Sequence, residues 1–223
     1  MKGQISRRDF LKITRNLSIG LGVADLVPYP IWVDNSIAAI PVSKGYLLVD
    51  SKKCQGCMSC MLTCSLVHEG CENLSFSRIQ VIQNPFARFS EDITVVQCRQ
   101  CVSPTCVEVC PTEALKPDPQ FGYVRNIDKE ACIGCLACVE SCPFSPSRAL
   151  FNFEKEYALK CDLCSDTPFW KEFGGPKGKQ ACVEVCPVRA IRFSGNIPLQ
   201  EGDTGYEVNL RKQGWRFLGY TAS

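Results

Sequence analysis

The chain has 223 residues, and its 25 basic and 23 acidic side chains leave a formal net charge of +2. This balance, with no basic run and no stripe of aromatic residues, argues against a nucleic-acid-binding protein. No segment reaches the roughly 18 apolar residues of a membrane-spanning helix, so we expect no transmembrane span in the chain itself.

Residues 1–38 are predicted to be a twin-arginine export signal. The segment from Ser6 to Lys12 reads Ser-Arg-Arg-Asp-Phe-Leu-Lys and precedes a moderately apolar stretch, as in signals of that pathway. Ser36-Ile37-Ala38 offers a small-residue cleavage site, which predicts a mature start near Ala39, with an uncleaved signal as the alternative. We therefore expect a periplasmic protein that is held at the membrane through its partners.

Short β-branched and aromatic runs beyond the signal predict small strands. These lie at Tyr46–Val49, Ile79–Ile82, Ile93–Gln97, Tyr123–Ile127 and Ala190–Phe193. Short helices are expected to hold the third and fourth cysteines of three cysteine blocks, at Val107–Cys110, Ala137–Cys142 and Ala181–Cys186. The prediction is an α+β, ferredoxin-like fold with small antiparallel sheets and short helices. Three segments lie outside this pattern: an insertion at 65–97, an exposed loop at Ser165–Gln180, and a surface arm at 195–223, for which a loose tail is the alternative.

Sixteen of the seventeen cysteines form four blocks of four. The first and third blocks share the spacing C-x2-C-x2-C-x3-C and comprise Cys54, Cys57, Cys60 and Cys64, and Cys132, Cys135, Cys138 and Cys142. The second is spaced C-x2-C-x4-C-x3-C, and the fourth is split by residues 165–181; they comprise Cys98, Cys101, Cys106 and Cys110, and Cys161, Cys164, Cys182 and Cys186. The first spacing is that of bacterial [4Fe–4S] ferredoxins. The four blocks therefore predict four [4Fe–4S] clusters.

Zinc and disulfide bonds are the competing explanations. Structural zinc sites usually join two C-x2-C pairs across a dozen or more residues, often with histidine, whereas this chain has one histidine, His68. Disulfide scaffolds space cysteines so as to close long loops, which does not explain repeated quartets that end in Cys-Pro. Gly56 and Gly134 precede the second cysteine of their blocks, where a sharp turn brings backbone N–H groups toward inorganic sulfur. An ordinary turn glycine is the alternative at each position.

The fourth cysteine of a ferredoxin run binds the other cluster of a pair, so the blocks are expected to work in pairs. Spacing alone does not show which blocks are paired. Taken together, the four ordered blocks resemble the four-cluster electron-transfer subunits of multisubunit oxidoreductases over about Lys44 to Ser194. Such subunits accompany molybdenum enzymes of the dimethyl-sulfoxide-reductase type and tungsten aldehyde oxidoreductases. The resemblance implies two nested two-cluster modules. An inner module spans 98–153, and an outer one combines 44–97 with the split fourth block in 154–194.

The resemblance also implies the ligand sets. The inner clusters take Cys98, Cys101, Cys106 and Cys142, and Cys110, Cys132, Cys135 and Cys138. The outer clusters take Cys54, Cys57, Cys60 and Cys186, and Cys64, Cys161, Cys164 and Cys182. Some relatives replace a cysteine of the third block with tryptophan and hold a three-iron cluster. Because Cys135 and Cys138 are both present here, we expect four four-iron clusters.

The predicted function is electron transfer without catalysis, since every block has its full quartet and no iron is left open to a substrate. The resemblance implies a catalytic molybdenum or tungsten pterin subunit as one partner and a quinol-reactive membrane subunit or cytochrome as another. A free polyferredoxin-type soluble carrier is the alternative, and a redox- or metal-sensing regulator is a further one.

Several side chains outside the predicted ligand sets could act beside the clusters. Cys71 is predicted to be a non-ligand thiol and His68 to be structural or exposed. Basic residues next to predicted ligands can offset the negative charge of clusters and raise their potentials, although most are expected to be solvated: Lys52, Lys53, Arg99, Lys129 and Lys160.

Overall fold

The computed structural model describes residues 29–33 and 36–211. The predicted twin-arginine motif at Ser6–Lys12 and the last twelve residues of the expected arm lie outside the described residues. The predicted cleavage triplet Ser36-Ile37-Ala38 falls within a strand, β2 (Ser36–Ile40), which pairs with β1 (Tyr29–Val33). Among the described residues, no helix combines the length and the apolar character that a membrane span requires.

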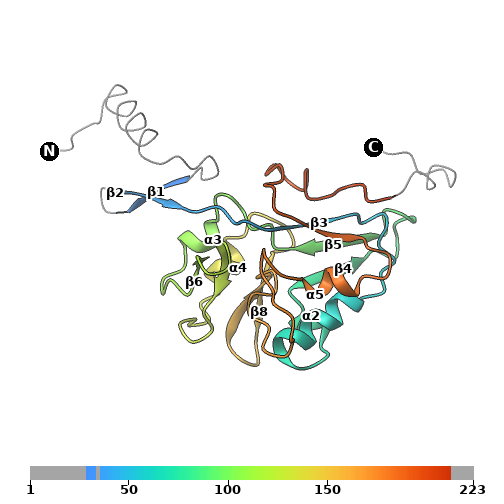
Figure 1. The fold of residues 1–223 in the computed structure, drawn as a ribbon, viewed down its shortest axis with the longest axis horizontal. Helices are drawn as coiled ribbons and strands as arrows, with labels where there is room; N and C mark the ends of the chain where they lie inside the picture. Colours follow the sequence, from blue (N-terminus) through green and yellow to red (C-terminus); the bar gives the residue numbers. More distant parts are fainter. Residues whose placement is uncertain (1–28, 34–35, 212–223) are drawn as a thin grey trace, which may run out of the picture.

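Small two-stranded antiparallel sheets separate the cysteine blocks (Figure 1). Beside β1–β2, the described residues form four of them: β3 (Tyr46–Val49) with β10 (Ile191–Ser194), β4 (Ile79–Gln83) with β5 (Ile93–Gln97), β6 (Leu115–Asp118) with β7 (Val124–Ile127), and β8 (Ala149–Asn152) with β9 (Tyr157–Lys160). The predicted small antiparallel sheets are thus confirmed. The sequence prediction missed β1 and β2, which fall in the predicted signal region, and also β6, β8 and β9. Lys116-Pro117 interrupts β6, and the apolar runs of β8 and β9 are only three residues long.

The pairing of β3 with β10 joins the two ends of the cysteine-rich region. Val49, just before the first block, lies opposite Ile191, which follows the fourth block. All four residues of β3 are buried. This sheet therefore carries Cys186 to the first block although the two are far apart in the sequence.

In the part of the chain that the structure describes, the helices are short except for one. They are α2 (Ser59–Glu69), α3 (Thr105–Glu108), α4 (Ala137–Glu140) and α5 (Ala181–Val185), with a 3-10 turn, η1 (Leu74–Phe76). Helix α2 packs against α5, and α3 packs against α4 in a separate part of the fold (Figure 1).

The prediction that helices include the fourth cysteine is wrong for α3, α4 and α5. Each ends before Cys110, Cys142 or Cys186. The residue after each of these cysteines is proline, and a proline disfavours helical backbone at the residue before it. The first block has Ser65 in the proline position, so α2 continues through Cys64 to Glu69.

The hydrophobic core is built partly from the predicted ligands. Leu47, Val49, Ile79, Leu163 and Ile191 pack in one cluster of buried residues that also includes Cys60, Cys64, Cys98, Cys161 and Cys182. Because cysteines take the place of aliphatic side chains in this core, clusters bound to them would stabilise the fold.

For the irregular segments, the structure corrects the expected exposed loop and argues against the alternative of a loose tail. The loop at Ser165–Gln180 is not wholly exposed, because Gly174, Gly175 and Gln180 are buried and the Gly175 N–H donates to the Leu163 carbonyl at 2.8 Å. The described part of the arm is not a loose tail. Tyr206 is buried, and Val49 exchanges backbone hydrogen bonds with residues 206 and 208 at 2.9 and 2.8 Å. Both segments therefore pack onto the cysteine-rich region.

Candidate iron–sulfur centres

A left-handed turn precedes the second cysteine of every block. The residue at this position has φ of +66° at Gly56, +50° at Gln100, +69° at Gly134 and +55° at Leu163. The predicted turn role of the two glycines is confirmed. In the second and fourth blocks a non-glycine residue adopts the same conformation, which costs about 1 kcal/mol or more, so the sequence offered no glycine signal there.

The last cysteine of every block accepts a backbone hydrogen bond at sulfur. The donors and distances are Arg78 N–H to Cys64 at 3.4 Å, Leu115 to Cys110 at 3.4 Å, Arg148 to Cys142 at 3.2 Å and Ala190 to Cys186 at 3.2 Å. A hydrogen bond donated to sulfur stabilises the thiolate, the form that binds metal. The repeated pattern indicates that all four blocks present this cysteine in the same way.

The sixteen block cysteines gather in four groups, here called sites 1 to 4. Site 1 comprises Cys54, Cys57, Cys60 and Cys186. There, burial together with the three neighbouring thiols raises the pKa of Cys60 to about 12. The other three groups each line a cavity: Cys64, Cys161, Cys164 and Cys182 in site 2, Cys98, Cys101, Cys106 and Cys142 in site 3, and Cys110, Cys132, Cys135 and Cys138 in site 4. Every group thus combines cysteines of two different blocks.

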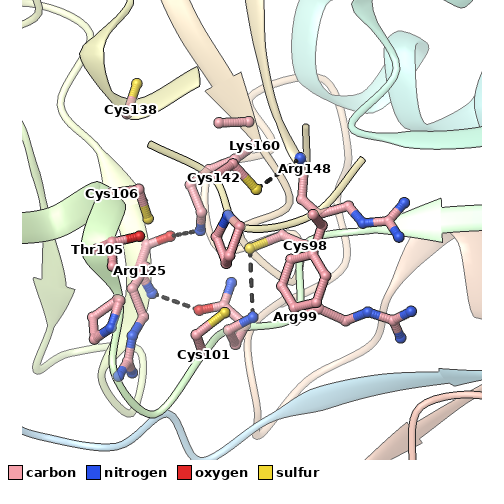
Figure 2. Close-up of a pocket in the computed structure, with 15 residues that line it drawn as sticks. Cys98, Arg99, Cys101, Thr105, Cys106, Arg125, Cys138, Cys142, Arg148 and Lys160 are labelled. Atoms are coloured by element: carbon pink, nitrogen blue, oxygen red, sulfur yellow. Dashed lines mark hydrogen bonds between the residues drawn. The ribbon is translucent and has the colours of Figure 1, made fainter. Parts of the chain in front are cut away.

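The four sites adjoin one another in numerical order. Cys182 of site 2 lies near enough to Cys60 of site 1 for their charges to interact, and Cys161 of site 2 likewise lies near Cys98 of site 3. Cys138 of site 4 also lines the site 3 cavity (Figure 2). Site 2 is the deepest, with all four cysteines buried, whereas Cys57 of site 1 and Cys135 of site 4 are exposed.

Site 3 has the donors that an anionic cluster requires. Arg99, Arg125 and Arg148 are buried beside its cysteines, and the Nε atom of each has no hydrogen-bond partner among the described residues. Buried donors are normally satisfied. Thiolates and sulfides supply negatively charged acceptors, so this donor set fits a [4Fe–4S] cluster. Among the described residues no group of three or more His, Cys, Asp or Glu is arranged to hold a single metal ion.

A buried ionic network supports site 2. Asp162 accepts hydrogen bonds from Arg78 at 2.6 Å and from His68 Nε2 at 3.0 Å. The other ring nitrogen of His68 lies 2.7 Å from the Cys64 carbonyl oxygen. Burial opposes ionisation of the Cys64 thiol, but His68 and Arg78 outweigh it and hold its pKa below the usual value. His68 is therefore structural and buried, and the sequence gave no sign of its partners Arg78 and Asp162.

The remaining cysteine is separate from these sites. Cys71 is exposed and lies in none of the four groups, in agreement with its prediction as a non-ligand thiol. Of the basic residues noted in the sequence, Arg99 and Lys160 are buried, whereas Lys52, Lys53 and Lys129 are at least partly exposed.

Comparison with known proteins decides the family. Residues 90–196 match the model of the 4Fe–4S dicluster domain. The chain is 36% identical to the thiosulfate reductase electron transfer subunit PhsB of Salmonella typhi, over 66% of this chain and 73% of that one. The chain belongs to the 4Fe–4S dicluster family of electron-transfer proteins. It is also 34% identical to the putative electron transport protein YsaA of Escherichia coli K12, over 66% of this chain and 87% of the relative.

These relatives confirm the predicted cofactor type and the predicted class of protein. A further relative, 32% identical over 69% of this chain and 73% of its own length, is the probable anaerobic dimethyl sulfoxide reductase chain YnfG of Escherichia coli K12. The homologues are iron–sulfur electron-transfer subunits, and this chain is an iron–sulfur protein of that kind. The match to residues 90–196 contains the second, third and fourth blocks, and the first block precedes it.

Proposed function

We propose that the chain is a non-catalytic relay subunit that holds four [4Fe–4S] clusters, one at each of sites 1 to 4. The observation that carries the proposal is the gathering of sixteen thiols into four quartets, each completed by a cysteine from a distant block. Sites 3 and 4 exchange cysteines between the second and third blocks, and sites 1 and 2 exchange them between the first and fourth. This arrangement supports the nested modules that the family resemblance implies.

Bound clusters supply one-electron redox chemistry, and the chain supplies their spacing and environment. The order of the sites favours a linear path from site 1 through sites 2 and 3 to site 4. Exposed Cys57 and Cys135 lie at the two ends of this path. Partners that exchange electrons with the subunit are therefore expected to dock near these two cysteines, while the buried thiols of site 2 exclude water from the interior.

The partners we propose are a catalytic subunit with a molybdenum or tungsten pterin site and a quinol-reactive membrane subunit or cytochrome. The names of PhsB, an electron transfer subunit of a thiosulfate reductase, and YnfG, a chain of a dimethyl sulfoxide reductase, support a complex of this type. Affinity purification under mild salt is expected to recover the large subunit with its metal. Isolation as a monomer without any companion would instead favour a free carrier.

We further propose that the subunit is periplasmic and reaches that compartment folded. The motif at Ser6–Lys12 supports export by the twin-arginine route, which suits clusters assembled in the cytoplasm. Replacement of Arg7 and Arg8 by lysine is expected to retain the protein in the cytoplasm. Unchanged periplasmic accumulation of that variant would contradict the proposal.

The cluster count and the ligand exchange are tested together. Anaerobically purified protein should contain about 16 iron atoms and as many acid-labile sulfides per chain, and a count near 12 or 8 would defeat four cubanes. Cys142→Ser should alter the electron paramagnetic resonance signal of site 3 and spare site 4. If Cys142→Ser instead lost the cluster held by Cys132, Cys135 and Cys138, Cys142 would be a ligand of the same cluster as the other three cysteines of its block. Cys71→Ser is the matched control and should leave the count unchanged.

A further inference from the structure

Site 3 is surrounded by buried cations. Arg99, Arg125, Arg148 and Lys160 all line its cavity (Figure 2), and their exposed fractions are only 4%, 1%, 6% and 3%. They come from four different segments: the second cysteine block, β7, the connection between the third block and β8, and β9. Folding therefore concentrates positive charge at this one site, and no single stretch of sequence carries it.

Lys160 is held with its ammonium directed toward the thiols. Its Nζ atom donates to the backbone carbonyl oxygens of Arg125 at 2.5 Å and Cys161 at 3.2 Å. Figure 2 shows this ammonium pointing into the cavity that Cys106 and Cys142 line. Both partners are neutral carbonyls, and no carboxylate in the described part of the chain forms an ion pair with Lys160.

The arginines are also underpaired. Arg99 and Arg148 share one carboxylate, that of Asp203, whose side chain is 58% exposed. Arg125 donates to the Tyr123 carbonyl at 2.8 Å. Within residues 29–33 and 36–211, however, its Nε and Nη2 atoms have no hydrogen-bond partner, and neither do Nε and Nη1 of Arg148. Among the described residues, the four cations around site 3 thus form ion pairs with one carboxylate, that of half-exposed Asp203, while the charge of Glu207 also acts on Arg99.

The other sites have no comparable excess of positive charge in the described structure. At site 2 the cations Arg78 and His68 are opposed by Asp162 and Glu69. At site 1 the charge of Glu207 acts on Cys54. The residues that line the site 4 cavity in the described part of the chain include no charged side chain.

We propose that the cluster of site 3 has the highest reduction potential of the four, so that an electron entering the relay rests there first. A cluster gains negative charge when it is reduced, and nearby cations stabilise the reduced state most strongly where water is excluded. The inference rests on the proposed function, since it requires a cluster at every site. Its consequence is a relay with an electron sink at an interior position, between sites 2 and 4.

The test is a reductive titration of the anaerobic holoprotein followed by electron paramagnetic resonance. The first signal to appear should be the one that Cys142→Ser alters. Lys160→Met should then shift the reduction equilibrium of that cluster at least tenfold toward the oxidised form, about 59 mV for a one-electron couple. Lys160→Arg keeps the positive charge and should therefore retain most of the wild-type reduction potential. Lys179→Met, which removes a half-exposed lysine paired with Glu172, is the control and should leave the order of reduction unchanged.

Two results would overturn the inference: a first signal that Cys142→Ser leaves intact, or an unaltered midpoint in Lys160→Met. Should Lys160→Met fail to incorporate clusters, Arg148→Gln is the second variant, and the same downward shift is required of it. Iron analysis separates the two proposals. A wild-type count below four clusters contradicts the proposed function, whereas a full count with another site reduced first contradicts only the sink at site 3.

Discussion

Asp162 is the position where one lost charge should weaken the fold most. It lies between Cys161 and Cys164 with its side chain 1% exposed, and it accepts hydrogen bonds from Arg78 and His68 at 2.6 and 3.0 Å. It also accepts from the backbone N–H of Cys164 at 3.0 Å. Asp162→Asn preserves the size of the side chain but leaves the buried cations without their main counter-charge.

The expected loss of stability follows from this burial. Removal of one partner of a buried ion pair costs about 3–5 kcal/mol, and Glu69, 3.5 Å from Arg78, favours the lower half of that range. In a protein of this size about 1 kcal/mol corresponds to 2–4 °C in Tm. The variant should therefore unfold roughly 6–16 °C below the wild type.

The assay is thermal unfolding of the anaerobic holoprotein, measured by circular dichroism and by loss of visible absorbance at one heating rate. Asp166→Asn is the matched control, because Asp166 forms an ion pair with Lys129 at 2.9 Å between side chains that are 43% and 29% exposed. Such a pair contributes about 0–1 kcal/mol, so its loss should lower Tm by less than about 4 °C. Equal shifts in the two variants would refute the importance assigned to the buried network.

Two further predictions concern the surroundings of site 2. Gly174→Ala would place Cβ 1.7 Å from the Cys164 carbonyl oxygen, so we expect destabilisation by about 1–3 kcal/mol and weakened iron retention. Gly195→Ala, whose Cβ would meet only the Lys44 carbonyl at 3.8 Å, should be close to neutral, and equal iron loss in both would count against the packing argument. Burial opposes ionisation of Glu69, but hydrogen bonds from Lys155 and Tyr157 outweigh it and lower its pKa. Its stabilisation is therefore present above the ordinary glutamate pKa of about 4.3 and is lost as pH falls below it. Glu69→Gln should flatten the fall in Tm below about pH 4.3, and an unchanged slope there would exclude this contribution.

Local spacing in the sequence was enough to predict the chemistry. Ligands three or four residues apart are positioned by a single turn of backbone, so the C-x2-C-x2-C-x3-C runs indicated cubane clusters before any contact was known. The ends of α3, α4 and α5 were also implicit in Pro111, Pro143 and Pro187, because the restriction acts on the residue directly before proline. Even where the prediction of the helices was wrong, the correction rests on local backbone sterics.

Only the tertiary structure brought distant segments together. The pairing of β3 with β10 places Cys186 beside the first block, and burial distinguishes Lys160 and Arg99 from the other basic residues that adjoin ligand cysteines. The sequence did not predict that Arg125 and Arg148 are buried beside thiols, because the sequence around an arginine on a strand or loop does not show whether its side chain faces water or a thiol. The sequence by itself therefore determined which cofactor the chain binds. The packing of remote segments decided which cysteines share a site and which site collects the buried positive charge, since ligand exchange and electrostatics both depend on proximity in space.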